Sequence, residues 1–421
     1  MDHSLTENIE QTTLDNGVRV VSETVPHVHS AAIGIFVGVG SRDEPEPLRG
    51  VSHFIEHMLF KGTPRRNARQ IADEIESRGG QLNAYTTKEM TCYEARVLSE
   101  DVALAMDVLT DMFRNSLFDP EEMEREKRVV LEEIKMYEDT PEELIHDVFE
   151  ATLFARHPLG RPVIGTEETV AHLQHEDVLH YWRTQYLPGR VVVAAAGNLT
   201  HRQLVQLTSD MLGDMPALSG KRDLRRPRPS GRSRQMRRRE TEQVHFCMGT
   251  SAYSKQDRER YALSILSNVL GGNMSSRLFQ EVREKRGLVY NIASYGRTYQ
   301  DGGFFCVFGG TSLETYDEVL RLIRVEFDKI LNEGITNDEL VKARTQVRGA
   351  LVIGLESMAS RMHRYGETLL AFGRIIPLAE VLAEYEAVTH ERIARVARQV
   401  LHDNPMTLTA IGPFPARRRA A

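Results

Sequence analysis

The segment His53-Phe54-Ile55-Glu56-His57 contains the residue types of a metal-dependent hydrolase. On a helix, His53 and His57 lie on one face about one turn apart, so both imidazoles can bind the same metal ion. Glu56 precedes the second histidine, and its carboxylate can take a proton from a water molecule that zinc has made more acidic. Catalytic zinc sites usually have three protein ligands and one open position, so a third ligand is expected elsewhere in the chain.

A glutamate-rich helix supplies the candidates for this third ligand. Asp119-Pro120 predicts its start, because Asp is a favourable N-cap and Pro suits the first helical position. The helix is expected over 120–137, and spacing alone does not choose among its carboxylates. The candidates are Glu121, Glu122, Glu124, Glu126, Glu132, Glu133 and Glu138.

Helical and strand patterns alternate along the chain, which indicates the elements that must position these residues. Apolar residues three and four apart predict helices over 51–60, 67–78 and 101–115. Apolar runs predict strands over 17–22, 31–39 and 191–196. Neither a GxGxxG motif nor a P-loop accompanies them, so a nucleotide-binding fold has no support.

The two halves of the chain resemble each other, which indicates an internal repeat. The segments 78–85 and 286–293 each precede a strand, a helix and a second acidic helix start. Each half ends in an apolar strand that runs into glycine. The chain has 421 residues, more than the roughly 250–300 that one hydrophobic core supports. These features predict an α+β fold with two homologous α/β-sandwich-like domains, each a mixed sheet with helices, at 1–215 and 240–421.

Residues 216–239 are expected to form an exposed Arg/Pro-rich linker between these domains, because they lack apolar periodicity and contain nine Arg and one Lys. Without interleaved aromatic residues or a recognisable binding fold, they do not predict nucleic-acid binding. The net charge of the whole chain is −7, which favours basic partners.

Composition gives the expected compartment. No apolar run reaches the ~18 residues that a membrane helix needs. The first seven residues have neither a basic nor an apolar signal region, and the three cysteines lack CxxC spacing. These observations predict a cytoplasmic protein with no membrane segment.

The context of the metal motif, Gly50-Val51-Ser52-His53-Phe54-Ile55-Glu56-His57-Met58-Leu59-Phe60-Lys61-Gly62-Thr63, resembles the pitrilysin and insulin-degrading enzyme superfamily, whose HxxEH signature defines the inverzincins. Within it, the chain is most similar to the β-subunits of mitochondrial processing peptidases and their bacterial homologues. The resemblance covers roughly Thr12 to Pro413. It implies one zinc ion per chain, held by His53, His57 and Glu133, with Glu132 as the alternative third ligand. It also implies that Glu126 supports the site.

Two further motifs carry the same resemblance. Gly79-Gly80-Gln81-Leu82-Asn83-Ala84-Tyr85-Thr86 matches an edge strand that pairs with the substrate backbone, which assigns Asn83 and Ala84 to substrate binding. Arg283 and Tyr290, seven residues apart, match an Arg/Tyr pair that holds the substrate carbonyl and its developing negative charge. The second half has no HxxEH, and Ala350 replaces the counterpart of Glu133, so that half is expected to bind no zinc.

The resemblance also implies an assembly. Larger members of the superfamily enclose a chamber with four such domains, and this chain has two, which is half of a clam-shell. A homodimer, or a heterodimer with a related subunit, is therefore expected, with Arg283 and Tyr290 completing the active site of the partner chain. The predicted function is zinc-dependent endopeptidase cleavage of unfolded peptides or presequence-like segments. The alternative is a non-catalytic scaffold or substrate-binding subunit, as in the respiratory-complex core relatives.

Overall fold

The computed structural model describes residues 8–218, 222 and 224–415. Residues 1–7, on which the expectation about targeting signals rests, and residues 219–221 and 223 of the Arg/Pro-rich segment lie outside the described residues. The chain divides into two compact units. The first comprises Met1–Lys135, Arg161–Asp223 and Leu351–Ala379, and the second comprises Met136–Gly160, Leu224–Ala350 and Glu380–Ala421.

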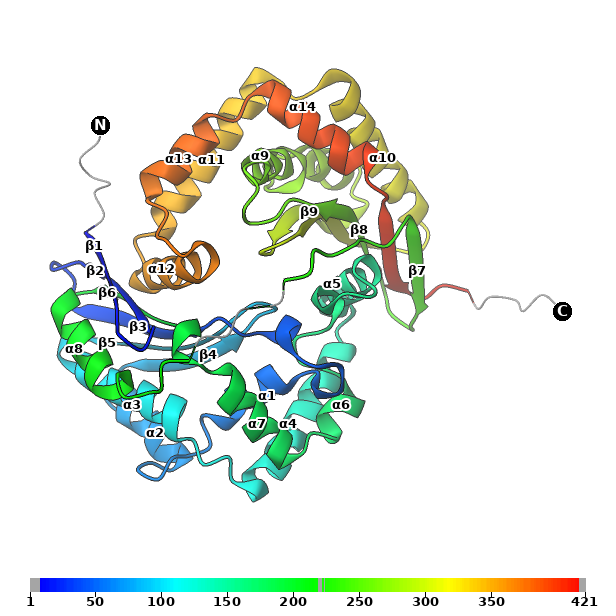
Figure 1. The fold of residues 1–421 in the computed structure, drawn as a ribbon. Helices are drawn as coiled ribbons and strands as arrows, with labels where there is room; N and C mark the ends of the chain where they lie inside the picture. The colour runs from blue at the N-terminus through cyan, green and yellow to red at the C-terminus, as the bar shows by residue number, and fades with distance from the viewer. Residues whose placement is uncertain (1–7, 219–221, 223, 416–421) are drawn as a thin grey trace. The chain divides into compact units, whose positions relative to one another are not determined.

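The first unit contains a six-stranded mixed sheet (Figure 1). Its strands, in spatial order, are β1 (Ile9–Thr13), β2 (Arg19–Thr24), β6 (Val191–Gly197), β3 (Ser30–Val37), β5 (Thr91–Leu98) and β4 (Gln81–Thr86). β2 and β6 are parallel, and the other neighbours are antiparallel. β3 and β6 are buried along almost their whole length, as their apolar runs predict. β4 lies at the end of this order and pairs only with β5 among the described residues.

Helices cover both faces of this sheet, and alternate residues of β3 face different helices. Ile33 and Ile35 pack in the cluster that includes α1 and α3, whereas Ala32 and Phe36 pack against α12. Figure 1 shows α12 on the face opposite α3. The helices of this unit are α1 (Val51–Met58), α2 (Ala68–Glu76), α3 (Val102–Asn115), α4 (Pro120–Glu138), α6 (Glu167–Ala171), α7 (His175–Gln185), α8 (His201–Leu212) and α12 (Met358–Phe372).

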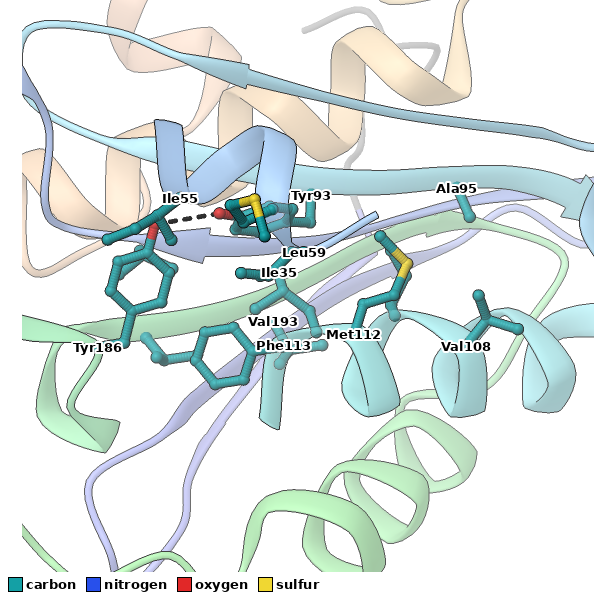
Figure 2. Close-up of a cluster of buried hydrophobic side chains, with 14 of the residues drawn as sticks. Ile35, Ile55, Leu59, Tyr93, Ala95, Val108, Met112, Phe113, Tyr186 and Val193 are labelled. Atoms are coloured by element: carbon teal, nitrogen blue, oxygen red, sulfur yellow. Dashed lines mark hydrogen bonds between the residues drawn. The ribbon is translucent and has the colours of Figure 1, made fainter. Parts of the chain in front are cut away.

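Figure 2 shows the core beneath α1. Ile55 and Leu59 pack there with residues of β3, β5, β6 and α3. Burial of each large apolar side chain contributes roughly 1.5–3 kcal/mol. Two tyrosines, Tyr93 and Tyr186, satisfy their hydroxyl groups by a mutual hydrogen bond of 3.0 Å. The motif helix therefore rests on a buried apolar layer that fixes its orientation.

The second unit contains a five-stranded mixed sheet. Its strands, in spatial order, are β7 (Ser233–Arg238), β11 (Thr407–Gly412), β8 (Val244–Ala252), β10 (Gly303–Thr311) and β9 (Val289–Thr298). α5 packs on one face, and α9, α10 and α14 contribute to the cluster on the other. The helices of this unit are α5 (Pro141–Leu153), α9 (Glu259–Gly271), α10 (Tyr316–Glu333), α11 (Asn337–Gly354), α13 (Leu378–Glu386) and α14 (His390–Arg398).

The two sheets have the same topology, which confirms the predicted repeat. The order β7-β11-β8-β10-β9 corresponds to β2-β6-β3-β5-β4, and in each sheet the first pair in this order is parallel. The first unit adds β1 at its edge. In this correspondence α9 follows β8 as α1 follows β3, so α9 is the counterpart of the motif helix.

The packing differs from the predicted linear division in two ways. α5 comes from the first half of the chain but packs on the second sheet, and α12 comes from the second half but packs on the first sheet. In addition, Ser233–Arg238 was expected to be linker but forms strand β7, which pairs in parallel with β11. The apolar signal is weak because β7 is an edge strand whose residues are half-buried or exposed. Among the described residues, no helix is long and apolar enough to cross a membrane.

Candidate metal centre

Helix α1 presents the motif because its apolar and polar residues fall on different faces. Val51, Phe54, Ile55 and Met58 are completely buried and fix the helix against the sheet. His53 and His57 are only partly buried, with 12% and 22% of their side chains exposed. The two imidazole rings lie 4.5 Å apart between centroids. The predicted i, i+4 arrangement is therefore present.

The start of α1 depends on two residues that the sequence analysis did not single out. Gly50 has a φ of 91°, and a Cβ there would lie 2.6 Å from the carbonyl oxygen of Ile164, so only glycine fits. Gly50 is the N-cap residue and has no side chain that could cap the helix. The buried carboxylate of Glu44 takes this role and accepts hydrogen bonds from the backbone N–H groups of Gly50 and Ser52, at 2.7 and 2.8 Å. Burial raises the pKa of Glu44 to about 8, against the opposing effect of these hydrogen bonds.

Glu133 of α4 completes a donor set with the two histidines. Its carboxylate oxygens lie 3.9 Å from His53 Nε2 and 3.7 Å from His57 Nε2. Four-coordinate zinc with ligands at 2.0–2.1 Å separates its donors by about 3.4 Å, so a small adjustment brings these three side chains around one ion. Two imidazoles and one carboxylate are also the donor types that catalytic zinc sites use. The residues present therefore fit zinc.

Glu126 holds His57 in the orientation that a metal requires. It lies 2.8 Å from His57 Nδ1 and 2.5 Å from the Nζ of Lys61. Burial alone would raise the pKa of Glu126, but its hydrogen bonds with His57 and Lys61 outweigh burial and lower it. When Nδ1–H donates to this carboxylate, the lone pair of Nε2 faces Glu133. Glu126 thus lies where the sequence analysis expected a supporting residue.

The first histidine is held in its neutral form. Burial, followed by the positive charge of His57, lowers the pKa of His53 to about 3. A neutral imidazole is the form that binds a metal. For His57 burial opposes protonation, but the hydrogen bond and charge of Glu126 outweigh it and raise the pKa.

Glu56 projects from the same helix and has its own partner. Thr86 of β4 donates a hydrogen bond of 2.5 Å to its Oε2. Burial raises the pKa of Glu56, and the hydrogen bond from Thr86 opposes this shift. The carboxylate is therefore both oriented and made more basic, as a general base requires.

The other candidate glutamates of α4 form ion pairs with basic side chains. Glu132, the alternative third ligand, is 73% exposed and pairs with Lys135 at 2.7 Å. Glu121 and Glu122 pair with Arg125, and Glu124 pairs with Lys127. Asp119 caps the helix as predicted, with its Oδ1 accepting from the N–H groups of Glu121 and Glu122.

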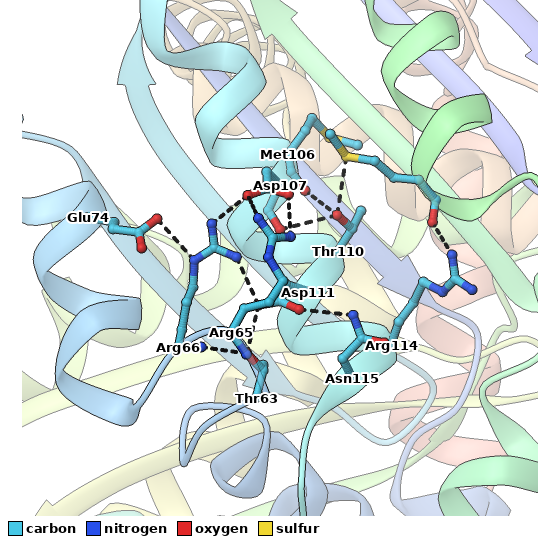
Figure 3. A network of polar contacts seen from close by, with 11 residues as sticks. Thr63, Arg65, Arg66, Glu74, Met106, Asp107, Thr110, Asp111, Arg114 and Asn115 are labelled. Atoms are coloured by element: carbon cyan, nitrogen blue, oxygen red, sulfur yellow. Dashed lines mark hydrogen bonds and ion pairs between the residues drawn. The ribbon is translucent and has the colours of Figure 1, made fainter.

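A polar network fixes the loop that leaves α1 (Figure 3). Thr63 donates to Asp111 of α3 at 2.7 Å. Arg66, in the same loop, connects to both α3 and α2. It pairs with Asp111 of α3 at 2.8 Å, with Asp107 of α3, and with Glu74 of α2 at 3.0 Å. The side chains of Arg66 and Asp111 are only 6% and 1% exposed, so this is a buried ion pair.

The predicted substrate-binding residues lie on β4, opposite β5. Asn83 pairs with Glu94 and Ala84 pairs with Tyr93. Because β4 ends the sheet order, its outer side is the place where a further strand could add. Thr86, on the same strand, contacts Glu56, so the edge strand and the general-base candidate are directly connected.

The remaining predicted pair belongs to the second unit. Arg283 lies in the π-helical turn η7 (Phe279–Glu284), and Tyr290 lies at the start of β9 with 79% of its surface exposed. The Arg283 guanidinium carbon is 5.3 Å from the Tyr290 ring centre. The structure thus brings this pair together within the second unit, whereas the metal donors belong to the first unit.

Sequence reasoning missed the roles of Glu44, Lys61 and Thr86. Thr86 belongs to the quoted edge-strand motif, and Lys61 lies four residues after His57, so sequence offered a weak signal for these two. Nothing in the sequence pointed to Glu44, because its contact with α1 depends on the path of the loop before the helix.

Comparisons with known proteins identify the family. The model described as Insulinase (Peptidase family M16) matches residues 19–167, and the one described as Peptidase M16 inactive domain matches residues 172–347. The protein named uncharacterized zinc protease YmxG of Bacillus subtilis is 41% identical over 405 residues, covering 96% of this chain and 98% of that protein. An uncharacterized zinc protease of Streptomyces coelicolor is 42% identical over 414 residues, covering 96% of this chain and 90% of that protein.

A solved structure agrees at the level of the fold. The crystal structure of a protease from Helicobacter pylori superimposes with a TM-score of 0.91 at 21% identity, covering 97% of this chain and 100% of that one. With full-length relatives and both domain models in agreement, this chain belongs to the insulinase family of peptidases, family M16.

Proposed function

We propose that this chain is a zinc-dependent endopeptidase that cleaves unfolded peptides or presequence-like segments. The observation that carries the proposal is the convergence of His53, His57 and Glu133, with Glu56 projecting from the same helix. The names of the full-length relatives, which call them zinc proteases, support it.

Each residue has a defined task in this proposal. His53, His57 and Glu133 hold the zinc ion, which when bound polarises the substrate carbonyl and makes a water molecule more acidic. Glu56 takes the proton of the attacking water and later gives it to the leaving amine. Thr86 orients the Glu56 carboxylate, and Glu126 keeps the His57 proton on Nδ1.

The substrate is proposed to bind as an added strand along β4, with Asn83 and Ala84 contacting it. Strand addition uses main-chain hydrogen bonds, so affinity depends little on side-chain identity. Only an extended peptide can pair in this way, which favours unfolded substrates over folded proteins. The negative net charge of the chain favours basic peptides.

We further propose that the active assembly is a dimeric chamber, either a homodimer or a heterodimer with a related subunit. A homodimer is sufficient because one chain carries both the metal donors and the Arg283/Tyr290 pair. These two residues would serve the active site of the partner chain. All three cysteines are free and buried, which suits a reducing compartment such as the cytoplasm.

The test compares wild type with Glu56→Gln and with the control Glu76→Gln, an exposed residue at the end of α2. Zinc per chain and cleavage of a quenched basic peptide are measured on each. Wild type and control should hold at least one zinc per chain and cleave in a chelator-sensitive way. Glu56→Gln should hold the same zinc and lose about 10²–10⁴ in kcat.

The other outcomes separate the alternatives. If wild type binds no zinc, the peptidase proposal fails and a non-catalytic scaffold or substrate-binding subunit takes its place. If Glu56→Gln cleaves as fast as wild type, the assignment of the base is wrong. If wild type binds zinc but cleaves only after a related subunit is added, the heterodimer replaces the homodimer.

A further inference from the structure

A second group of metal-binding side chains lies in the first unit, outside the candidate metal centre. Cys92 and Glu94 come from β5, and His363 comes from α12. One donor atom from each lies within 4.8 Å of the other two. Among the described residues, this is the only such group besides His53, His57 and Glu133.

The fold brings these residues together for simple reasons. Cys92 and Glu94 are two positions apart on a strand, so they face the same side of the sheet. α12 packs on that side, and the His363 ring lies 5.6 Å from Tyr85 and 6.2 Å from Phe36, edge-on to each. Gly366, one turn further along α12, lets the helix approach closely, since a Cβ there would lie 2.5 Å from Phe36.

This group is separate from the candidate metal centre. Cys92 belongs to the hydrophobic cluster between the sheet and α12. The motif helix α1 packs on the other face, through Phe54 and Ile55. The sheet itself therefore lies between the two groups, and no donor is shared.

The three side chains differ in their exposure to solvent. Cys92 is completely buried, whereas the side chains of Glu94 and His363 are 18% and 30% exposed. Glu94 and His363 Nε2 form an ion pair. An ion bound here would replace this ion pair and contact all three donors.

The local charges favour a cation. A carboxylate oxygen of Glu94 lies within 4.8 Å of both the Cys92 sulfur and a ring nitrogen of His363. Glu367, on the next turn of α12, contributes further negative charge at Cys92 and His363. A divalent ion would displace the thiol proton and the proton between His363 and Glu94, since metal ligands must be deprotonated.

We infer that Cys92, Glu94 and His363 form a second metal site, selective for a thiolate-binding divalent transition metal such as zinc. A thiolate and an imidazole select zinc or cobalt over magnesium and calcium, which prefer oxygen ligands. The bound ion fastens α12 to β5 and, through the register of Cys92 with Tyr85 and Glu94 with Asn83, to the edge strand β4.

Cobalt provides a test that does not depend on peptidase activity. Metal-free full-length protein is titrated with Co²⁺, and two quantities are read: cobalt bound per chain and the thiolate-to-cobalt charge-transfer absorption. The donor set of His53, His57 and Glu133 contains no sulfur, so this absorption reports only a cysteine-containing site. Wild type should bind about two cobalt ions with one charge-transfer band.

Matched variants assign the band. Glu133→Gln should keep the band and bind about one ion fewer, because it disrupts only the other site. Cys92→Ser should lose the band and about one ion. The control Cys247→Ser changes another buried cysteine, one whose sulfur lies 3.7 Å from His146 Nδ1, and should keep the band.

His363→Gln serves if Cys92→Ser does not fold, because this side chain is partly exposed. It should weaken cobalt binding at the band-forming site by at least about 10-fold. A wild-type protein with no band at two equivalents of cobalt would overturn the inference. A band that survives in Cys92→Ser, or that disappears in Cys247→Ser, would also overturn it. None of these results affects the proposed peptidase site.

Discussion

Within α4, neighbouring glutamates differ completely in what they contact. Glu133 faces both imidazoles of α1, whereas Glu132 extends to solvent and pairs with Lys135. The difference follows from helical geometry, since consecutive residues point about 100° apart. A shift of one position along the helix therefore separates the proposed metal ligand from a surface charge.

Exchange of Glu133 for Gln should remove zinc from the site formed with His53 and His57, whereas the same change at Glu132 should not. Loss of Glu133 leaves two protein ligands, too few for a catalytic zinc site. Zinc content after dialysis should fall by about one ion per chain in Glu133→Gln and stay at the wild-type value in Glu132→Gln. The reverse pattern would make Glu132 the ligand and require a different rotation of α4.

Thr86→Val should slow catalysis without removing zinc. The hydroxyl donates to the Glu56 carboxylate, and a hydrogen bond to a charged group contributes about 1.5–3 kcal/mol, which corresponds to about 10-fold or more in kcat. KM and zinc content should stay near wild type. The matched control is Thr184→Val, an exposed threonine of α7. Equal kcat values for the two variants would show that Thr86 does not orient the base.

At the scale of elements, α1 is held by its buried face, by its cap and by the loop that follows it. Its apolar face packs in the main cluster, and Glu44 satisfies two of its N-terminal N–H groups. The Arg66–Asp111 pair joins the following loop to α3, and Arg66 also binds Glu74 of α2 (Figure 3). The position of the histidines thus depends on contacts outside the motif.

Asp111→Asn should destabilise the first unit because it removes the charge of the most buried carboxylate that pairs with Arg66. Breaking one partner of a buried ion pair costs about 3–5 kcal/mol, and the remaining partners of Arg66, Asp107 and Glu74, reduce this toward the lower value. The measurement is the free energy of unfolding in urea at pH 7. Asp73→Asn, an exposed partner of Arg69 on α2, is the control and should change it by less than about 1 kcal/mol.

The same pair predicts a dependence on pH. Burial alone would raise the pKa of Asp111, but its hydrogen bonds with Asn115, Thr63 and Arg66 outweigh burial and lower it from the ordinary value of 3.8. A carboxyl group with a lowered folded pKa stabilises the protein above its unfolded pKa and loses that contribution as pH falls through the folded value. The difference between wild type and Asp111→Asn should therefore be constant from pH 7 to about 5 and shrink below about 3.9. A difference that grows in acid would contradict this assignment.

At the scale of the whole molecule, each half of the chain contributes one helix to the sheet of the other unit. α12 packs against the first sheet, where Tyr365 donates to the buried Glu23 and Arg361 pairs with the same carboxylate. α5 packs against the second sheet, where Glu150 accepts from Tyr299 at 2.9 Å. The two units are therefore interdependent, and neither corresponds to a continuous stretch of sequence.

Mixing two inactive variants tests the proposed sharing of active sites between chains. Glu56→Gln lacks the base, and Arg283→Ala/Tyr290→Phe lacks the second-unit pair. If the pair serves the partner chain, mixed dimers contain one complete site, and an equal mixture should recover about a quarter of wild-type activity. Glu56→Gln mixed with Glu133→Gln is the control and should stay inactive. No recovery in the first mixture, with exchange of subunits shown by differential tags, would mean that each pair serves its own chain.

The sequence by itself determined the helices that carry the metal motif and the glutamates, and the repeat. Periodicity predicted α1, α3 and α4 to within a few residues, and Asp119 caps α4 as expected. These features are local, because side-chain spacing and capping act within a few residues. The HxxEH spacing likewise predicted that His53 and His57 share a face.

The tertiary structure alone decided which distant residues meet. Spacing left seven glutamates open as the third ligand, and only the rotation of α4 against α1 brings Glu133 to both histidines. The contact of Thr86 with Glu56, the cap of Glu44 on α1 and the approach of His363 to Cys92 likewise join elements far apart in the sequence. Long-range contacts of this kind depend on how the buried faces of different elements pack together. The residue pattern within one segment does not specify where another segment will lie against it.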